Sequence, residues 1–417
     1  MSILYNRAVL LAKVESTFGE DAAPSPSTDA HLVGDPQVSY DITQLERNIT
    51  RATLSKLPSV TGRKIASAQF TYEVRNNGVM DGSVPPAIGT LLRGCAMAQT
   101  SISTPAGTIG DADPQGTPTG EFTFTKTTAY DGAITRVVTI ECTTAGASGT
   151  AEFKVSAPAV SGLAAYEALN QVMTDATPFP LMGSAVITPT VGTSFVLGDT
   201  FTITLRPARV EYTFTSDTDS MESLTLYIYF DGLLHKLTGA RGTFTVEGTG
   251  GNYANFNFDF TGNYVDVIDS PMPINPNYET QKPTMVELAN LNLGGVGTFC
   301  ASSFSLDAAN EVVIRDCINN AEGYAGAMIV ARTPTATIDP EAELVATHDF
   351  FGIMKSGAEM EFHVAVGTQK GNVVEFYAPN VQYRSIGYGE RNSIRIMDVQ
   401  LGLTTNEADD ELVISFS

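Results

Sequence analysis

The chain of 417 residues has no tryptophan, four cysteines and four histidines. The cysteines are widely spaced and form no Cys-x-x-Cys pair, so we expect reduced thiols that serve as small apolar side chains. The histidines, His31, His235, His348 and His363, are also far apart and have no acidic residues at the spacing of metal ligands. These absences predict a protein without a metal site and without a cofactor.

Basic residues are scarce. The chain has 24 lysines and arginines against 46 acidic residues, which gives a formal net charge of −22. Surfaces that grip nucleic acid are basic, so this balance argues against a protein that binds phosphates tightly. It favours a solvated acidic face, or a wall to which a polyanion does not adhere.

Long apolar runs are absent too. No run approaches the ~20 residues that a membrane helix needs. The amino terminus has a short apolar run but lacks the basic start and the cleavage site of a secretion signal. We therefore expect a soluble chain that is made in the cytoplasm and does not enter a membrane.

Motifs of catalysis are missing as well. The chain has no Gly-x-Ser-x-Gly nucleophile elbow, and the glycines within 294–297 lack the lysine of a phosphate-binding loop. The acidic clusters within 217–222 and 407–411 could hold a hard cation, but neither has the residue order of a calcium loop, which favours solvated turns. The sequence predicts no enzymatic activity.

The chain does have regular alternation of apolar and polar residues, most clearly within 221–267. Two reversals, at Asp231-Gly232 and within 248–252, contain glycine, which permits the positive φ of tight hairpins. This period of two predicts an antiparallel meander with one apolar face. The apolar residues of its strands are Leu224, Leu226, Ile228, Phe230, Phe256, Phe258 and Phe260.

One clear helix is expected beside the meander. Two prolines followed by apolar residues on one side predict an amphipathic helix from Ile88 to Met97 that lies across a sheet. Residues 5–18 are compatible with a short helix, an arm or a strand. Toward the carboxyl end we expect a helix at 348–355 and strands at 359–366, 372–377, 393–401 and 411–416.

The composition changes within 104–206, where charged residues become rare and Thr, Ser, Ala and Gly dominate. Short alternating strands separated by glycine-rich turns predict a small inserted β-sandwich, with a helix at 164–175. Four prolines within 270–283 predict an extended connector.

The order of elements after the connector resembles the order before the insert: strands, a short amphipathic segment, then a hairpin. We therefore expect a mainly β protein with two tandem β-sandwich or barrel domains, each with a short helix. The expected boundaries are 1–103 with 207–269 for the first domain, 104–206 for the insert, 270–283 for the linker and 284–417 for the second domain.

Several segments together resemble the major tail tube proteins of long-tailed, non-contractile bacteriophages. They are LLAKVESTFGED near the start, PPAIGTLLRGCAM, VEYTFTSDTDSMESLTLYIYFDGLLHKLTGARG, FNFDFTGNY and ASSFSLDAANEVVIRD. The resemblance covers most of the first 330 residues and is weaker in the last 80. None of these segments is a catalytic signature.

Proteins of that family stack as rings into a hollow tube whose wall is a continuous β-barrel, and phage DNA passes through the lumen. The resemblance implies that strands of several copies close the tube wall and that DNA passes without specific binding. We expect two strands of the meander in that wall, the one with Leu224, Leu226, Ile228 and Phe230 and the one with Phe256, Phe258 and Phe260. It also implies a virion tail component that is assembled in the host cytoplasm, with a tape measure protein and a tail terminator as partners. With two tail-tube-like domains per chain, three copies would form a ring with pseudo-sixfold symmetry, which we favour over a hexamer.

Contacts between rings are expected from two segments. The amino-terminal arm contributes Tyr5 and Phe18, and a basic segment that we place in a connecting loop of the meander contributes Lys236 and Arg241. Basic loops of one copy would meet acidic faces of the next copy and set the register of the rings.

Two other functions are compatible with a β-rich chain. A carbohydrate-binding β-sandwich on a virion or cell surface would use exposed aromatic rings, and the chain has 15 tyrosines but no tryptophan. A hydrolase on a β scaffold would need a convergent pair of acids, which the sequence does not reveal.

Overall fold

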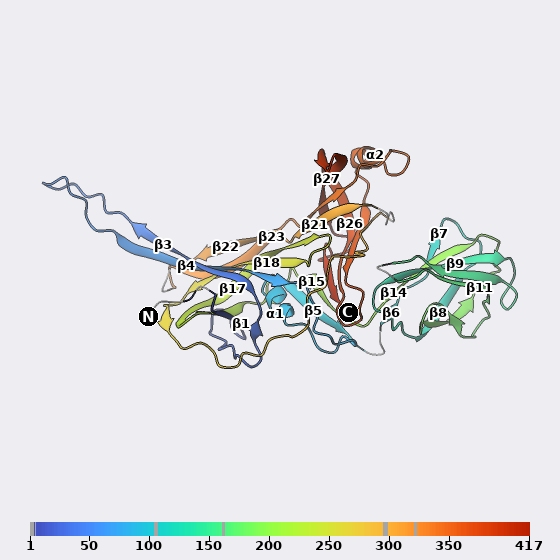
Figure 1. Cartoon of the computed structure of the whole chain (residues 1–417), viewed down its shortest axis with the longest axis horizontal. Helices are drawn as coiled ribbons and strands as arrows, with labels where there is room; N and C mark the ends of the chain where they lie inside the picture. The colour runs from blue at the N-terminus through green and yellow to red at the C-terminus, as the bar shows by residue number, and fades with distance from the viewer. Residues whose placement is uncertain (1–3, 5, 104–106, 161–162, 295–298, 321–322) are drawn as a thin grey trace.

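The computed structural model describes residue 4 and residues 6–103, 107–160, 163–294, 299–320 and 323–417. The described part consists mainly of antiparallel strands with two short helices (Figure 1). A long hairpin extends from one end of a central body, and a separate sandwich lies at the opposite end. The expected mainly β class is confirmed.

Eight strands lie side by side in the body and form its largest layer. Each pairs antiparallel with its neighbours. In spatial order they are β3 (Gly34–Leu45), β4 (Val60–Glu73), β18 (Asn255–Tyr264), β17 (Leu233–Thr249), β21 (Ala301–Asp307), β24 (Thr335–Pro340), β27 (Ile394–Thr404) and β26 (Val374–Arg391).

The shorter strands of the body pack against the apolar face of this layer. The first halves of β17 and β26 leave the layer to pair with two of these strands, β16 and β25. One hydrophobic core, with residues from both halves of the chain, fills the space between. The shorter strands are β1 (Ala8–Val14), β2 (Ala30–His31), β5 (Met97–Ile102), β15 (Arg209–Phe214), β16 (Leu224–Phe230), β19 (Ile268–Asp269), β20 (Asn292–Leu293), β25 (Met360–Val366) and β28 (Val413–Phe416).

The arrangement repeats within the chain. The layer consists of two sets of four strands that lie side by side: β3, β4, β18 and β17, then β21, β24, β27 and β26. Along the chain, each set begins with a pair of strands, continues with a helix and ends with a long hairpin. The helices are α1 (Ile88–Arg93) and α2 (Phe350–Ser356). Each long strand has a register shift at the same place, between Thr238 and Arg241 in β17 and between Tyr383 and Ser385 in β26. The same order of elements thus occurs in the two halves of the layer.

The meander forms as its alternation predicts. In β18 the phenylalanine rings stack along the strand with centroids 5.8 Å apart, while the residues between them stay accessible. Asp231 and Gly232, with φ of 37° and 112°, make the turn between β16 and β17, which only positive φ allows. The predicted apolar residues of β16 and β18 are buried, except Phe230, which is half-buried. They are Leu224, Leu226, Ile228, Phe256, Phe258 and Phe260. In β16 the residues between them, Thr225 and Tyr227, are buried too, so both faces of this strand are covered and its expected polar outer row is not exposed.

The helices differ in length from the expectation in one case. α1 ends at Arg93, so the predicted extension to Met97 is wrong: Ala96 has a φ of 59°, which a helix does not accept, and Met97 begins β5. α2 lies where the sequence predicts it. Asp349 caps its first turn by accepting a hydrogen bond from the Gly352 amide.

The insert is a sandwich with its own core. The predicted helix at 164–175 is wrong, because these residues form strand β11, which pairs with β10. One sheet has the order β11, β10, β9, β14 and β6, with β7 also on β14, and the other has the order β12, β13 and β8. The bounds are β6 (Thr108–Ile109), β7 (Asp113–Gln115), β8 (Phe122–Thr128), β9 (Arg136–Thr144), β10 (Glu152–Ala157), β11 (Tyr166–Val172), β12 (Phe179–Pro180), β13 (Val186–Val191) and β14 (Thr200–Arg206).

Two further strands, β22 (Asn310–Asp316) and β23 (Tyr324–Arg332), form a two-stranded ribbon in the connection that leads along the chain from β21 to β24. The amino-terminal segment, for which three conformations were open, is the strand β1. The connector within 270–283 has no helix or strand, and Glu279 fixes it to the body by accepting a hydrogen bond from the Ala87 amide at 2.6 Å. All four cysteines are free thiols, and Cys95 and Cys142 are buried as small apolar residues.

Candidate assembly surfaces

One face of the eight-stranded layer carries a row of polar residues that reaches from one edge to the other. Residues that face each other across antiparallel strands share a side of the sheet, so the pairing defines the row directly. The row contains three aspartates, and two arginines lie on the same face at its margins: Arg241, which faces Thr261 and is buried, and Arg391, which faces Ile394. Its residues are Gln37, Ser39, Ser67, Gln69, Thr71, Thr243, Thr245, Asn257, Asp259, Ser305, Asp307, Thr335, Thr337, Ser385, Asp398 and Gln400.

The same layer has an open edge on each side. In the described part of the chain, β3 pairs with β4 alone, and the second half of β26, from Ser385 to Arg391, pairs with β27 alone. Unpaired backbone donors and acceptors therefore line both edges. Such edges are where a further strand adds to a sheet.

The hairpin of β3 and β4 continues beyond the body as an arm, residues 42–64 (Figure 1). The arm has five lysines and arginines and one glutamate, in a chain whose acidic residues outnumber its basic residues by nearly two to one. Where the arm joins the body, Arg63 pairs with Asp316 and Lys64 lies over the Tyr264 ring, so Arg47, Arg51 and Lys56 are the basic residues farther along the arm. It also exposes large apolar side chains, among them Leu45, Ile49 and Leu54. An arm that is both basic and apolar, on an acidic body, fits a contact with another acidic surface.

The residues predicted to contact a neighbouring ring have partners within the chain. Lys236 and Arg241 lie in strand β17, not in a loop, because the register shift lets the strand continue past Gly239. Arg241 is buried, and its guanidinium donates to the Met221 carbonyl at 2.7 Å and lies 5.1 Å from the centre of the Phe18 ring. Tyr5 lies outside the described residues.

Lys236 is held by two groups. Its Nζ atom donates to Asp21 at 3.0 Å and to the Tyr227 hydroxyl at 2.9 Å. Burial lowers the pKa of Lys236, but these two partners outweigh burial and raise the pKa above its ordinary value. The lysine therefore stays charged while it ties the amino-terminal segment to the meander.

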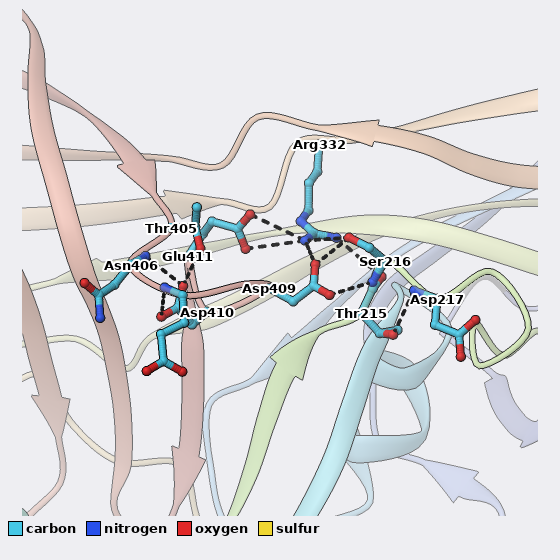
Figure 2. Close-up of polar contacts among 10 residues, drawn as sticks. Thr215, Ser216, Asp217, Arg332, Thr405, Asn406, Asp409, Asp410 and Glu411 are labelled. Carbon is cyan, nitrogen blue, oxygen red and sulfur yellow. Dashed lines mark hydrogen bonds and ion pairs between the residues drawn. The ribbon is translucent and has the colours of Figure 1, made fainter.

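The acidic clusters bind basic side chains and turns of this chain. Figure 2 shows the Arg332 guanidinium between Asp409, Glu411 and Ser216. Burial raises the pKa of Asp409, but hydrogen bonds from Ser216 and Arg332 outweigh it, so the pKa lies below its usual value. Asp410 accepts hydrogen bonds from 405–407 and closes their turn. Among the described residues no group of three or more His, Cys, Asp or Glu side chains could hold a metal ion.

The insert meets the body through a buried carboxylate. Glu375 on β26 accepts hydrogen bonds from the amide and the hydroxyl of Thr135 at 2.7 and 2.6 Å. The Nε2 atom of His363 lies 3.7 Å from the same carboxylate. Burial raises the pKa of Glu375, but His363 and Thr135 outweigh burial and hold the pKa below its usual value.

A comparison with models of protein families decides what these surfaces belong to. The model of the phage tail tube protein matches residues 6–404, which is nearly the whole chain. The chain belongs to the phage tail tube family. No curated protein matches it. As a tail tube protein it is a structural component of the virion tail that assembles with itself into a tube, which favours this function over a carbohydrate-binding module or a hydrolase.

Sequence reasoning missed the most informative features of this tail tube protein. It did not identify the two open edges, because the position of a strand in a sheet depends on long-range pairing. It also gave little weight to the arm, although five basic residues within 42–64 are visible in the sequence.

No described helix is long and apolar enough to span a membrane.

Proposed function

We propose that this protein closes into rings by joining the open edges of neighbouring copies, and that the rings stack into the tail tube. The observation that supports this most directly is the pair of open edges on a layer whose two faces differ, one apolar and covered by the shorter strands, the other carrying the polar row. Joining the edges would leave no unpaired strand, and the wall would become a continuous barrel.

The repeat within the chain supports a ring of three copies. Each copy supplies two equivalent sets of four strands, so three copies supply six sets and give pseudo-sixfold symmetry. We assign the first repeat to 1–103 with 207–269, the second to 284–417, and the decoration to the insert, 104–206. A sandwich attached outside the layer leaves the bore free.

The polar row would line the lumen. Asp259, Asp307 and Asp398 would repel the phosphates of DNA. The two arginines on this face would bind phosphates weakly, because Arg241 is buried and the Arg391 guanidinium is paired with Asp339. DNA would therefore pass through without specific binding during delivery into the host. A structural wall of this kind has no enzymatic activity, and it would meet a tape measure protein inside and a tail terminator at one end, after assembly in the host cytoplasm.

Stacking of rings would use the arm. Its basic residues and exposed apolar side chains would lie on the acidic surface of the adjacent ring. Phe18 and Lys236 would lie at the same contact, with Arg241 supporting the Phe18 ring from beneath.

Negative-stain electron microscopy of the purified protein tests this proposal. We expect tubes from the full chain. In one variant, Asn-Gly replaces residues 46–59 and forms a two-residue turn between Leu45 and Val60, which already face each other in the hairpin. This variant should give single rings without tubes. A matched variant that keeps the arm but carries Arg47→Glu and Arg51→Glu should also fail to stack. A full chain that stays monomeric at every concentration and ionic strength would contradict the proposal.

A further inference from the structure

The joint between the two repeats shows how a strand adds to this layer. β21, the first strand of the second repeat, pairs with the end of β17, where Ser305 faces Glu247. The pairing continues past β21, because the Ala308 amide donates to the Phe244 carbonyl at 3.0 Å. This joint lies within one chain, yet it connects two units with the same strand order.

The open edge of β26 corresponds residue by residue to the edge of β17 that β21 occupies. Counting from the register shift, Arg241 corresponds to Ser385, since each is the first residue paired after the shift. Six residues later, Glu247 corresponds to Arg391, and both pair with the start of the returning strand of their hairpin. The two edges therefore have the same alternation of faces from Ser385 to Arg391, and β17 continues two residues further, to Thr249.

The open edge of β3 corresponds in the same way to β21. Ser67 and Thr337 occupy equivalent places, because each faces, across the neighbouring strand, the first residue after the register shift. Ser39 faces Ser67 as Ser305 faces Thr337. Ser39 of one copy is therefore the counterpart of Ser305.

Exposure of the counterparts shows that these edges lack a neighbour. Phe244 and Ala308, which meet at the joint within the chain, are both fully buried. Their counterparts Tyr388 and Ile42 are 59% and 38% exposed. Two apolar side chains that the joint would bring face to face are thus left in solvent in a single copy.

We propose that the joint between copies repeats the joint within the chain, with β3 of one copy antiparallel to the end of β26 of the next. This inference rests on the proposed function and specifies its contact. The register places both polar rows on one face, and a shift of one residue would turn one row to the opposite face. The facing residues are Ser39 and Arg391, Asp41 and Gly389, and Ile42 and Tyr388.

Engineered disulfides test this register. Ser39 and Arg391 correspond to a pair without mutual backbone hydrogen bonds, whose Cα atoms in antiparallel sheets lie within the range that a disulfide spans. The two residues lie on opposite edges of one copy, so a bond between them must join two copies. The test variant carries Ser39→Cys and Arg391→Cys with Cys300→Ser and Cys317→Ser. The control variant carries Gln37→Cys in place of Ser39→Cys and is otherwise identical. Gln37 lies on the same face of β3 as Ser39 but two residues away, so its thiol would not face position 391 in the proposed register.

Mild oxidation of tubes should move the test variant from the mass of one chain to that of a closed ring on denaturing electrophoresis, while the control stays largely uncrosslinked. Tubes in which the control pair crosslinks as well as the test pair, or in which neither pair crosslinks, would overturn the register but leave the proposed function intact. The parent chain for this test carries only Cys300→Ser and Cys317→Ser. If that parent chain gives monomers and no tubes, the result would instead contradict the proposed function. If only the double variant fails to assemble, the pair Asp41→Cys with Gly389→Cys probes the same register with the same expected shift in mass.

Discussion

Excision of the insert is a direct probe of how the chain is divided. Ile102 ends β5 and Arg209 begins β15, and the two residues face each other in the antiparallel pair. Replacing residues 103–208 by Asn-Gly would close that pair with a tight turn. Since the body has a core separate from that of the insert, we expect the shortened chain to fold and to form tubes without outer decorations.

The cost of the excision follows from the contacts that it removes. Glu375 loses two hydrogen bonds from Thr135, and Lys370 loses one to the Asp131 carbonyl at 2.9 Å. Hydrogen bonds to charged groups contribute about 1.5–3 kcal/mol each when the group stays buried, but here water replaces the insert around Glu375. We therefore expect the free energy of unfolding of the body to fall by about 2–4 kcal/mol.

Shortening the loop should change this value little. The ends of the insert are already held together, because Thr108 pairs with Arg206 in β6 and β14. Loop-closure entropy grows only with the logarithm of the free length, so a folded insert with joined ends adds a small term.

Urea denaturation followed by far-ultraviolet circular dichroism measures the effect. The full chain should show separate contributions from body and insert, and the excised chain should keep the transition of the body. Glu375→Gln in the full chain is the control, since it perturbs the contact without removing the insert. An excised chain that aggregates or lacks a cooperative transition, while the control folds, would refute the division of the chain.

Three further predictions concern stability. Phe258→Ala should lower the free energy of unfolding by about 3–5 kcal/mol in urea titrations, because strands paired on both sides of β18 prevent the cavity from collapsing. The depressed pKa of Glu375 contributes stability above its ordinary value of 4.5, so the melting temperature should fall as the pH drops through and below that value, with a smaller fall in Glu375→Gln; equal slopes would contradict the assignment. Arg332→Met should destabilise by about 1–3 kcal/mol, measured in urea, because it leaves Asp409 and Glu411 without their cation, and Asp409→Asn in the same background should recover part of the loss.

Local patterns predicted the strands well, because alternation with period two is a property of neighbouring residues. The burial of Phe256, Phe258 and Phe260 follows from it directly. The same kind of evidence failed for 164–175, where pairing with β10 imposes a strand on residues compatible with a helix. It also failed around Gly239. The sequence suggested a loop there, but the residue, with a φ of 58°, forms a bulge within strand β17.

The assembly surfaces were less accessible to sequence reasoning. A basic arm is visible in composition, but an open edge is not, because β3 and β26 lie at edges only as a result of how six other strands are ordered. The roles of Lys236 and Arg241 were equally hidden, since their partners Asp21 and Met221 come from distant or folded-back segments.

Carrying both repeats on one polypeptide has a lasting consequence for this molecule. Two nearly equivalent units are always present in equal numbers, and a mutation changes one of them without altering the other. The inserted sandwich lies between β5 and β15 in the first unit, whereas α2 leads directly to β25 in the second. In the ring proposed above, the insert would therefore occur at every other equivalent position, and the positions between would be free to change independently.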